Sequence, residues 1–175
     1  MTRRAALVVL GALTLGLGVF LAGQDDRMRD AGGPGIVPFE LAFDRERAQE
    51  IKTDWDSEGQ DAARTSLVVD YAFLFAYGAF LVLAALATRD LASRREWSRM
   101  TRAGAVAVPA AIAAPAFDAI ENAWLLVSLE TRSGDLAPLA GSIFACLKFG
   151  ALALVAAYLL AGLALRVMSS RPADA

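Results

Sequence analysis

Residues 103–128 read AGAVAVPAAIAAPAFDAIENAWLLVS. This stretch contains two ionisable side chains, Asp118 and Glu121, and is otherwise almost entirely apolar or small. A helix of about 20 residues crosses the hydrocarbon core of a bilayer, which is roughly 30 Å thick. The many alanines permit neighbouring helices to approach closely. We therefore predict a membrane-spanning helix at the packing centre of a helical bundle.

Three other segments have a similar length and character, at residues 5–22, 67–87 and 139–165. The first carries no charge, the second only Asp70 and the last only Lys148. The sequence therefore predicts an all-α fold, a polytopic membrane four-helix bundle that forms a single domain. The segments between the spans are predicted to be an outer loop with a short amphipathic helix, a cytoplasmic loop and a short last outer loop: 23–66, 88–102 and 129–138.

The overall composition supports a membrane protein and excludes several other classes. Hydrophobic residues make up 57% of the 175 residues, although 21% are charged, and the mean hydropathy is +0.46. So much apolar surface excludes a disordered chain, and a formal net charge of -2 gives no basis for nucleic-acid binding. The chain has no histidine and one cysteine, so the common zinc, haem and di-iron sites lack their ligands. We expect neither a cofactor nor a metal.

Basic residues are unevenly distributed between the two sides of the predicted bundle. Short cytoplasmic segments are enriched in arginine and lysine. The loop at 23–66 carries six basic and eleven acidic residues. Nine basic residues fall on the opposite side: Arg3, Arg4, Arg89, Arg94, Arg95, Arg99, Arg102, Arg166 and Arg171. Lysine is scarce beside arginine and alanine, which is typical of a GC-rich bacterial genome. We predict a multi-pass protein of the bacterial inner membrane with both termini in the cytoplasm.

The first span allows two interpretations. Arg3 and Arg4 followed by an apolar run also fit a cleaved signal peptide. Near Ala22, however, bulky Phe20 and Leu21 stand where a small residue is needed for cleavage. We favour a retained membrane helix, and cleavage would leave three spans in the same orientation.

The long outer loop shows signs of local structure. Residues 36–43 form an apolar stretch that is interrupted by Glu40. Asp44 is a candidate N-cap for a short helix that ends near Trp55. The apolar side chains of this helix share one face at helical spacing: Ala48, Ile51 and Trp55. That face either packs on the outer end of the bundle or forms a lid over a cavity. Residues 57–60, SEGQ, resemble a capping box, so the helix of the second span should begin outside the membrane.

Four ionisable side chains lie inside the spans, where charge is costly and such groups usually face the protein interior and find partners. At about 1.5 Å per residue, they lie roughly 4–10 Å from the middle of their spans, all toward the outer face. Asp118, Glu121 and Asn122 project from one helix face because they are spaced at i, i+3 and i+4. This polar layer and two neighbouring tyrosines form the predicted ligand-binding site: Asp70, Tyr71, Tyr77, Asp118, Glu121, Asn122 and Lys148.

Three functions agree with such a layer. The leading hypothesis is binding of a lipid, an amphipathic small molecule or a cation in a cavity that opens outward. The alternative is an intramembrane enzyme in which Asp118 and Glu121 act as catalytic acid and base on a lipid-soluble substrate. The third is a scaffold or accessory subunit, in which Lys148 forms a buried ion pair that only aligns helices. A connected cavity would favour the first two, and tight packing the third. The expected partners are membrane lipids and a hydrophobic small-molecule ligand.

Several motifs resemble a group of small bacterial four-helix membrane proteins: GIVPFELAFDRERAQEI at 35–51, Trp55, DYAF at 70–73, Tyr77 and FDAIEN at 117–122. The resemblance covers most of the chain from residue 35 to the end of the third span, and it implies a layout but no activity. The layout also resembles that of the sterol-isomerase and sigma-2-receptor superfamily, with four spans, a long loop after the first and an acid near the outer start of the second. The sterol isomerases of that superfamily depend on a histidine, which this chain lacks. The resemblance therefore does not imply isomerase activity.

Overall fold

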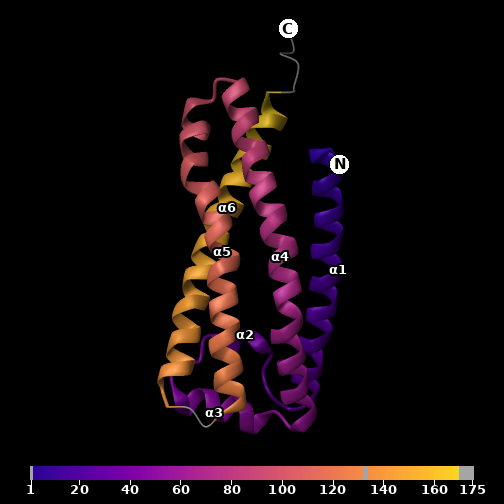
Figure 1. Cartoon of the computed structure of the whole chain (residues 1–175), viewed down its shortest axis with the longest axis vertical. Coiled ribbons are helices and arrows are strands. Elements are labelled where there is room, and N and C mark those ends of the chain that lie inside the picture. The colour runs from indigo at the N-terminus through magenta and orange to yellow at the C-terminus, as the bar shows by residue number, and fades with distance from the viewer. Residues whose placement is uncertain (1, 132–133, 170–175) are drawn as a thin grey trace.

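A computed structural model describes residues 2–131 and 134–169. Arg132 and Arg171, which contribute to the predicted charge distribution, lie outside the described residues. The described residues form six helices in the order α1 (Arg3–Asp30), α2 (Ile36–Glu40), α3 (Arg45–Asp54), α4 (Ser57–Arg94), α5 (Ser98–Glu130) and α6 (Leu136–Met168). Figure 1 shows the four long helices running along the long axis of the molecule, with the short helices α2 and α3 at one end.

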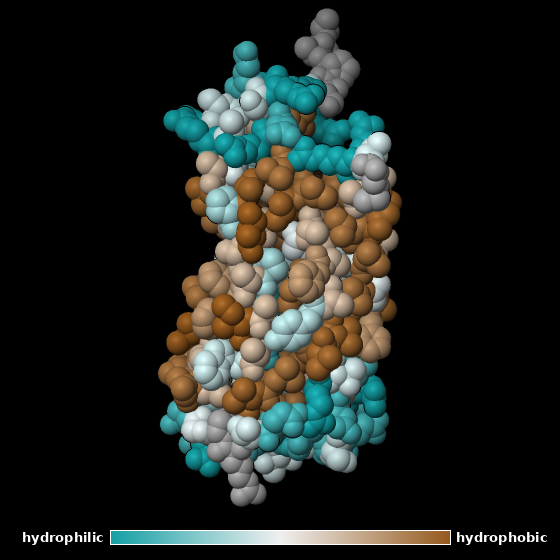
Figure 2. Space-filling model, viewed as in Figure 1, coloured by the Kyte–Doolittle hydropathy of each residue, from teal (hydrophilic) through white to brown (hydrophobic). Residues whose placement is uncertain are grey.

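The four long helices have the dimensions of membrane spans. Within the described residues, α1, α4, α5 and α6 are long and apolar enough to cross a membrane. Figure 2 shows a broad apolar belt between two polar ends. Several apolar side chains of α1 and α4 are more than 70% exposed: Val8, Leu15, Val19 and Phe75. Such exposure fits contact with lipid rather than water. These features confirm the predicted all-α bundle with four helices of spanning length.

The helices are longer than the predicted spans. Residues 23–30 belong to α1, although the sequence-based prediction places them in the outer loop. Residues 57–66 belong to α4, which begins before the predicted span as the SEGQ motif indicates. Hydropathy marks the edge of the hydrocarbon core, whereas a helix continues into water where its charged side chains are solvated and paired. At this end Arg27 pairs with Glu58 on the neighbouring helix. The N-cap of α4 is also one residue earlier than the SEGQ motif suggests, because the Asp56 carboxylate accepts a hydrogen bond from the Gly59 backbone N–H.

The two ends of the bundle differ in their charges. The start of α1, the α4–α5 turn and the end of α6 lie together at the end opposite α2 and α3 (Figure 1). This arginine end carries the described members of the basic group, among them Arg3, which pairs with Asp90. The opposite end, which we call the loop end, carries α2, α3 and most of the acidic residues.

The bundle core follows a heptad pattern. Buried residues of α5 recur at alternating spacings of three and four: Gly104, Ala107, Ala111, Ala114, Asp118, Glu121, Leu125 and Ser128. This is the repeat of helices that pack side by side in left-handed bundles. Small side chains let the helices approach closely, as where Gly78 of α4 packs directly on Pro115 of α5. Two charged residues thus occupy core positions, with apolar clusters on either side of them.

The loop end has its own apolar core. As predicted, Asp44 caps α3 by accepting a hydrogen bond from the Arg47 backbone N–H. The Trp55 side chain is 1% exposed, packs on Phe39, and donates a hydrogen bond from Nε1 to the Pro34 carbonyl at 2.6 Å. The predicted apolar face of α3 is therefore buried in the core of the loop end. This agrees with the interpretation that the face packs on the end of the bundle.

We expect Gly33→Ala to destabilise the loop end. A Cβ at Gly33 would lie 2.3 Å from Cδ1 of Trp55, whose ring is held by its own packing and hydrogen bond. Overpacking of this kind costs about 1–3 kcal/mol, which should appear as a lower Tm by circular dichroism. Gly23→Ala is the matched control, because a Cβ there meets no atom within 4 Å and alanine favours a helix. Equal effects of the two substitutions would contradict the packing of Trp55.

Candidate functional site

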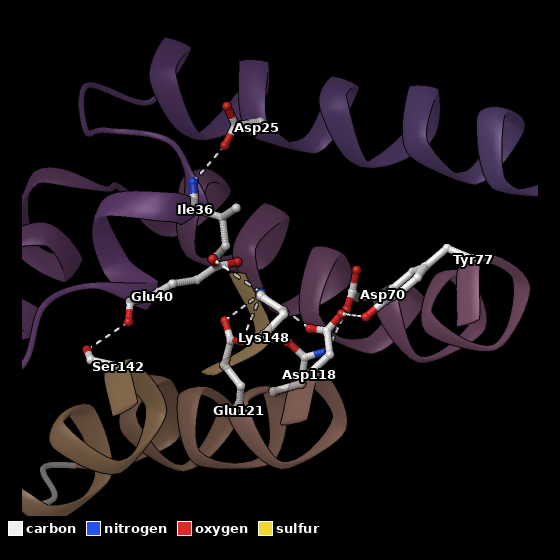
Figure 3. A network of polar contacts seen from close by, with 10 residues as sticks. Asp25, Ile36, Glu40, Asp70, Tyr77, Asp118, Glu121, Ser142 and Lys148 are labelled. Atoms are coloured by element: carbon white, nitrogen blue, oxygen red, sulfur yellow. Dashed lines mark hydrogen bonds and ion pairs between the residues drawn. The ribbon is translucent and has the colours of Figure 1, made fainter. Parts of the chain in front are cut away.

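A buried cluster of charges lies between the helices near the loop end. The Lys148 ammonium on α6 is 2.8 Å from Oε2 of Glu121 and 3.3 Å from Oδ1 of Asp118, both on α5. It is also 3.5 Å from Oε2 of Glu40 on α2. None of these four side chains is more than 10% exposed. Figure 3 shows the three carboxylates pointing toward the lysine. A cluster so removed from water persists because opposite charges offset the cost of desolvation.

Helix α4 contributes the second part of the cluster. The Tyr77 hydroxyl donates a hydrogen bond of 2.6 Å to Oδ2 of Asp118. Asp70 accepts a hydrogen bond of 2.6 Å at Oδ2 from the Asn122 amide. Two short bonds between neighbouring helices thus hold the carboxylates in place. Tyr71 instead donates to a backbone oxygen of α5, the carbonyl of Ala119, at 3.1 Å.

Glu40 belongs to the cluster although the sequence-based prediction does not include it. It ends the short helix α2, which folds back against the bundle so that the Ser142 hydroxyl on α6 donates to the Glu40 carbonyl at 2.7 Å. At the start of α2, the Ile36 backbone N–H donates to Asp25 on α1 at 2.6 Å. Burial raises the pKa of the Glu40 carboxyl, and the nearby Lys148 ammonium opposes this shift. The signal for Glu40 in the sequence is its position as the one acidic residue in the otherwise apolar stretch 36–43.

Carboxyl groups outnumber basic groups in the cluster. Among the described residues, Lys148 is the one basic side chain that contacts it, against four carboxyl groups on Glu40, Asp70, Asp118 and Glu121. With all four ionised, the net charge would be -3. Asp70 is the member that forms no ion pair within the described part of the chain. The cluster can therefore accept further positive charge, as protons or as a cation.

A cavity of about 440 Å³, which we call the large cavity, adjoins the cluster. At one end it is lined by polar groups on four helices: Glu40, Asp70, Tyr77, Asp118 and Lys148. The rest of its lining is almost entirely apolar: Val37, Phe73, Phe80, Leu81, Phe149, Leu152 and the short side chain of Thr14. Its volume falls in the range of small-molecule binding sites, about 300–1,000 Å³. The cavity thus combines an acidic end with an aromatic and aliphatic channel.

The structure separates the predicted site residues into two groups. Asp70, Tyr77, Asp118 and Lys148 line the large cavity. The others lie behind it or beside it and are not among its lining residues: Tyr71, Glu121 and Asn122. Glu121 has no exposed surface, and Asn122 is 2% exposed. Glu121 pairs with Lys148, and Asn122 orients Asp70 through its hydrogen bond.

The donor arrangement does not suggest a metal centre. Within the part of the chain that the structure describes, no three histidine, cysteine, aspartate or glutamate side chains are placed so that they could hold one metal ion. No protein-family model, curated protein or solved structure matches this chain, and the resemblances drawn from its motifs stay predictions.

Proposed function

We propose that this chain is a multi-pass protein of the bacterial inner membrane that binds an amphipathic molecule with a cationic head in the large cavity. The head would lie at the acidic end of the cavity, and the hydrocarbon chain would lie against the aromatic and aliphatic residues. The observation that carries this proposal is the cavity itself, which joins buried carboxylates to an apolar channel within one continuous space.

The charge of the cluster supports a cationic head rather than an anionic one. Asp70 and Asp118 both line the cavity, and the single lysine is shared among three carboxylates. An incoming carboxylate or phosphate would add negative charge beside these acids, and like charges in a poorly solvated site repel strongly. An ammonium group would instead reduce the excess and could donate hydrogen bonds to Asp70.

The apolar end supports a ligand that arrives from the bilayer. Phe73 and Phe80 stand on α4 near Gly18 and Gly11 of α1, where a Cβ would come within 3.6 Å of the nearest ring atom in each case. Phe149 on α6 is 39% exposed. The channel therefore runs between α1 and α6, beside the apolar belt, where a lipid-soluble molecule is concentrated.

The proposed orientation follows from the charge of the two ends. Arginines gather at the arginine end, and such residues favour the cytoplasmic side. The loop end would then face outward, with the charged cluster nearer the outer surface and both termini in the cytoplasm.

The geometry favours binding over the acid–base enzyme and over the scaffold. A catalytic pair of Asp118 and Glu121 would have to face one substrate, but Glu121 is fully buried outside the large cavity and is paired with Lys148. A scaffold whose polar layer only aligns helices needs no cavity beside that layer.

Three dodecyl compounds test the proposal by changing only the head: dodecylamine, dodecanol and dodecanoate. We expect the protein in lipid nanodiscs to bind dodecylamine at least tenfold more tightly than dodecanoate, because a protonated amine complements the carboxylates. Dodecanol should fall between them. Isothermal titration calorimetry, with empty nanodiscs as the baseline, measures the three affinities.

A variant of the channel controls for partition into lipid. Leu81→Trp should weaken binding of dodecylamine and dodecanol alike, because the larger side chain occupies the channel. Leu13→Trp on α1 is the matched control, since Leu13 is 51% exposed and does not line the large cavity. Failure of all three compounds to bind above the empty nanodiscs, or equal effects of the two variants, would refute the proposed function.

A further inference from the structure

A second, smaller cavity of about 240 Å³ lies between α1, α2 and α4. It shares Val37, Glu40 and Asp70 with the large cavity, so the two meet at the carboxylate that has no ion pair. Its remaining polar lining consists of Asp25 on α1 and Ser66 on α4. This cavity is the more polar continuation of the site toward the loop end.

Ser66 lines the smaller cavity with a hydroxyl group that is open for hydrogen bonding. It is 6% exposed, and its hydroxyl forms no hydrogen bond with any residue that the structure describes. Other hydroxyl groups in these helices, such as those of Thr14 and Thr53, donate to the carbonyl four residues earlier. Because Ser66 lines the smaller cavity, its hydroxyl can form a hydrogen bond with a molecule that enters there.

Most other polar atoms that line this cavity already accept hydrogen bonds. Asp25 accepts a hydrogen bond from the Ile36 backbone N–H at Oδ1 and two from Arg29 at Oδ2. Asp70 accepts from Asn122 at Oδ2, while its Oδ1 accepts no hydrogen bond from the described residues. Glu40 pairs with Lys148 through Oε2. On α4, the cavity thus presents an open hydroxyl, on Ser66, and an open carboxylate oxygen, on Asp70, which belongs to the carboxylate without an ion pair.

These two groups lie one helical turn apart on the same face of α4. Residues at i and i+4 have Cβ atoms about 5–6 Å apart. A head that carries an amine and a hydroxyl on neighbouring carbon atoms has the length to reach both, with one hydrogen bond at each end. A simple amine can bind Asp70 but leaves Ser66 without a partner.

We infer that the smaller cavity is a hydroxyl subsite, and that the site takes a long-chain amino alcohol, with its ammonium on Asp70, its hydroxyl on Ser66 and its chain in the large cavity. This inference rests on the proposed function, because it specifies the head of the ligand that the large cavity would bind. The Ser66 hydroxyl donates to, or accepts from, the hydroxyl of the ligand, and Asp70 accepts from the ammonium.

Two probes that differ by one hydroxyl test the inference: 2-aminododecan-1-ol and dodecylamine. We expect the protein in nanodiscs to bind the amino alcohol about tenfold more tightly than the amine, which is the upper range of the effect of one added hydrogen bond. Ser66→Ala should abolish this preference and leave dodecylamine affinity within about twofold of the original protein. Ser93→Ala is the matched control, because Ser93 is an exposed serine on the same helix and lies outside both cavities.

The outcomes separate this inference from the proposed function. Equal affinity for the two probes, or a preference that survives Ser66→Ala, overturns the hydroxyl subsite while dodecylamine binding still supports the large cavity as a site for amphipathic cations. Binding of neither probe by the original protein overturns both. Retained dodecylamine binding by the Ser66→Ala variant shows that this variant is folded.

Discussion

Lys148→Met is expected to lower the free energy of unfolding by about 3–5 kcal/mol, because it leaves buried carboxylates without their cation. The ammonium lies within 3.5 Å of three carboxyl groups on two other helices, and the side chain is 8% exposed. Methionine retains much of the side-chain volume, so the loss reports on charge more than on packing. Unfolding titrations with sodium dodecyl sulfate in mixed micelles, followed by circular dichroism, measure this change.

A compensating substitution distinguishes charge from packing. Adding Glu121→Gln to Lys148→Met removes the carboxylate nearest to the lysine, and it should recover a large part of the lost stability. Lys52→Met is the control at the other lysine, whose ammonium donates to the Ser128 carbonyl near the end of α5. We expect a smaller loss there, because Lys52 lies nearer to solvent. An unchanged stability of Lys148→Met would show that the lysine does not balance the buried acids.

Asp70→Asn is expected to reduce the affinity for dodecylamine by about 30-fold or more. Removing one partner of a desolvated charge pair costs about 2–5 kcal/mol of binding free energy, and each 1.4 kcal/mol corresponds to a factor of ten. The fold should tolerate the change, because Asp70 forms no ion pair in the described structure and an amide oxygen can still accept the hydrogen bond from Asn122. Titration calorimetry in nanodiscs measures the affinity.

Two comparisons make the result specific. Dodecanol affinity should change by less than about threefold, because an alcohol carries no charge to lose its partner. Asp61→Asn is the matched control, since Asp61 is an exposed aspartate on the same helix that pairs with Arg64. If Asp70→Asn bound dodecylamine as tightly as the original protein does, Asp70 would not be the counterion of the ligand.

The core of the bundle could be predicted because its determinants are local in sequence. The spacing of Asp118, Glu121 and Asn122 on one helix places them on one face whatever the neighbouring helices do, and all three are indeed buried. Lys148 is the one basic residue within the predicted spans, so its contact with Asp118 or Glu121 could be anticipated as well. The structure shows that it contacts both.

The membership of Glu40 and the shape of the cavity could not be predicted in the same way. Glu40 contacts a lysine that lies 108 positions away in the chain. Its placement depends on the fold of residues 31–43 between two helices, and no periodic pattern describes so short a segment. Two hydrogen bonds from distant residues hold this segment, one at Ile36 and one at the Glu40 carbonyl.

The amino-acid sequence by itself determined the class of the protein, the four apolar helices and the faces that turn inward, because hydropathy and helical periodicity are properties of each segment alone. Only the tertiary structure decided which polar groups remain without a partner and where space is left between the helices. Both depend on how separate segments pack against one another. Asp70 and Ser66 illustrate this difference: their spacing on one helix is visible in the sequence, but their open hydrogen-bonding groups and the two cavities beside them arise only when α1, α2 and α6 are in place.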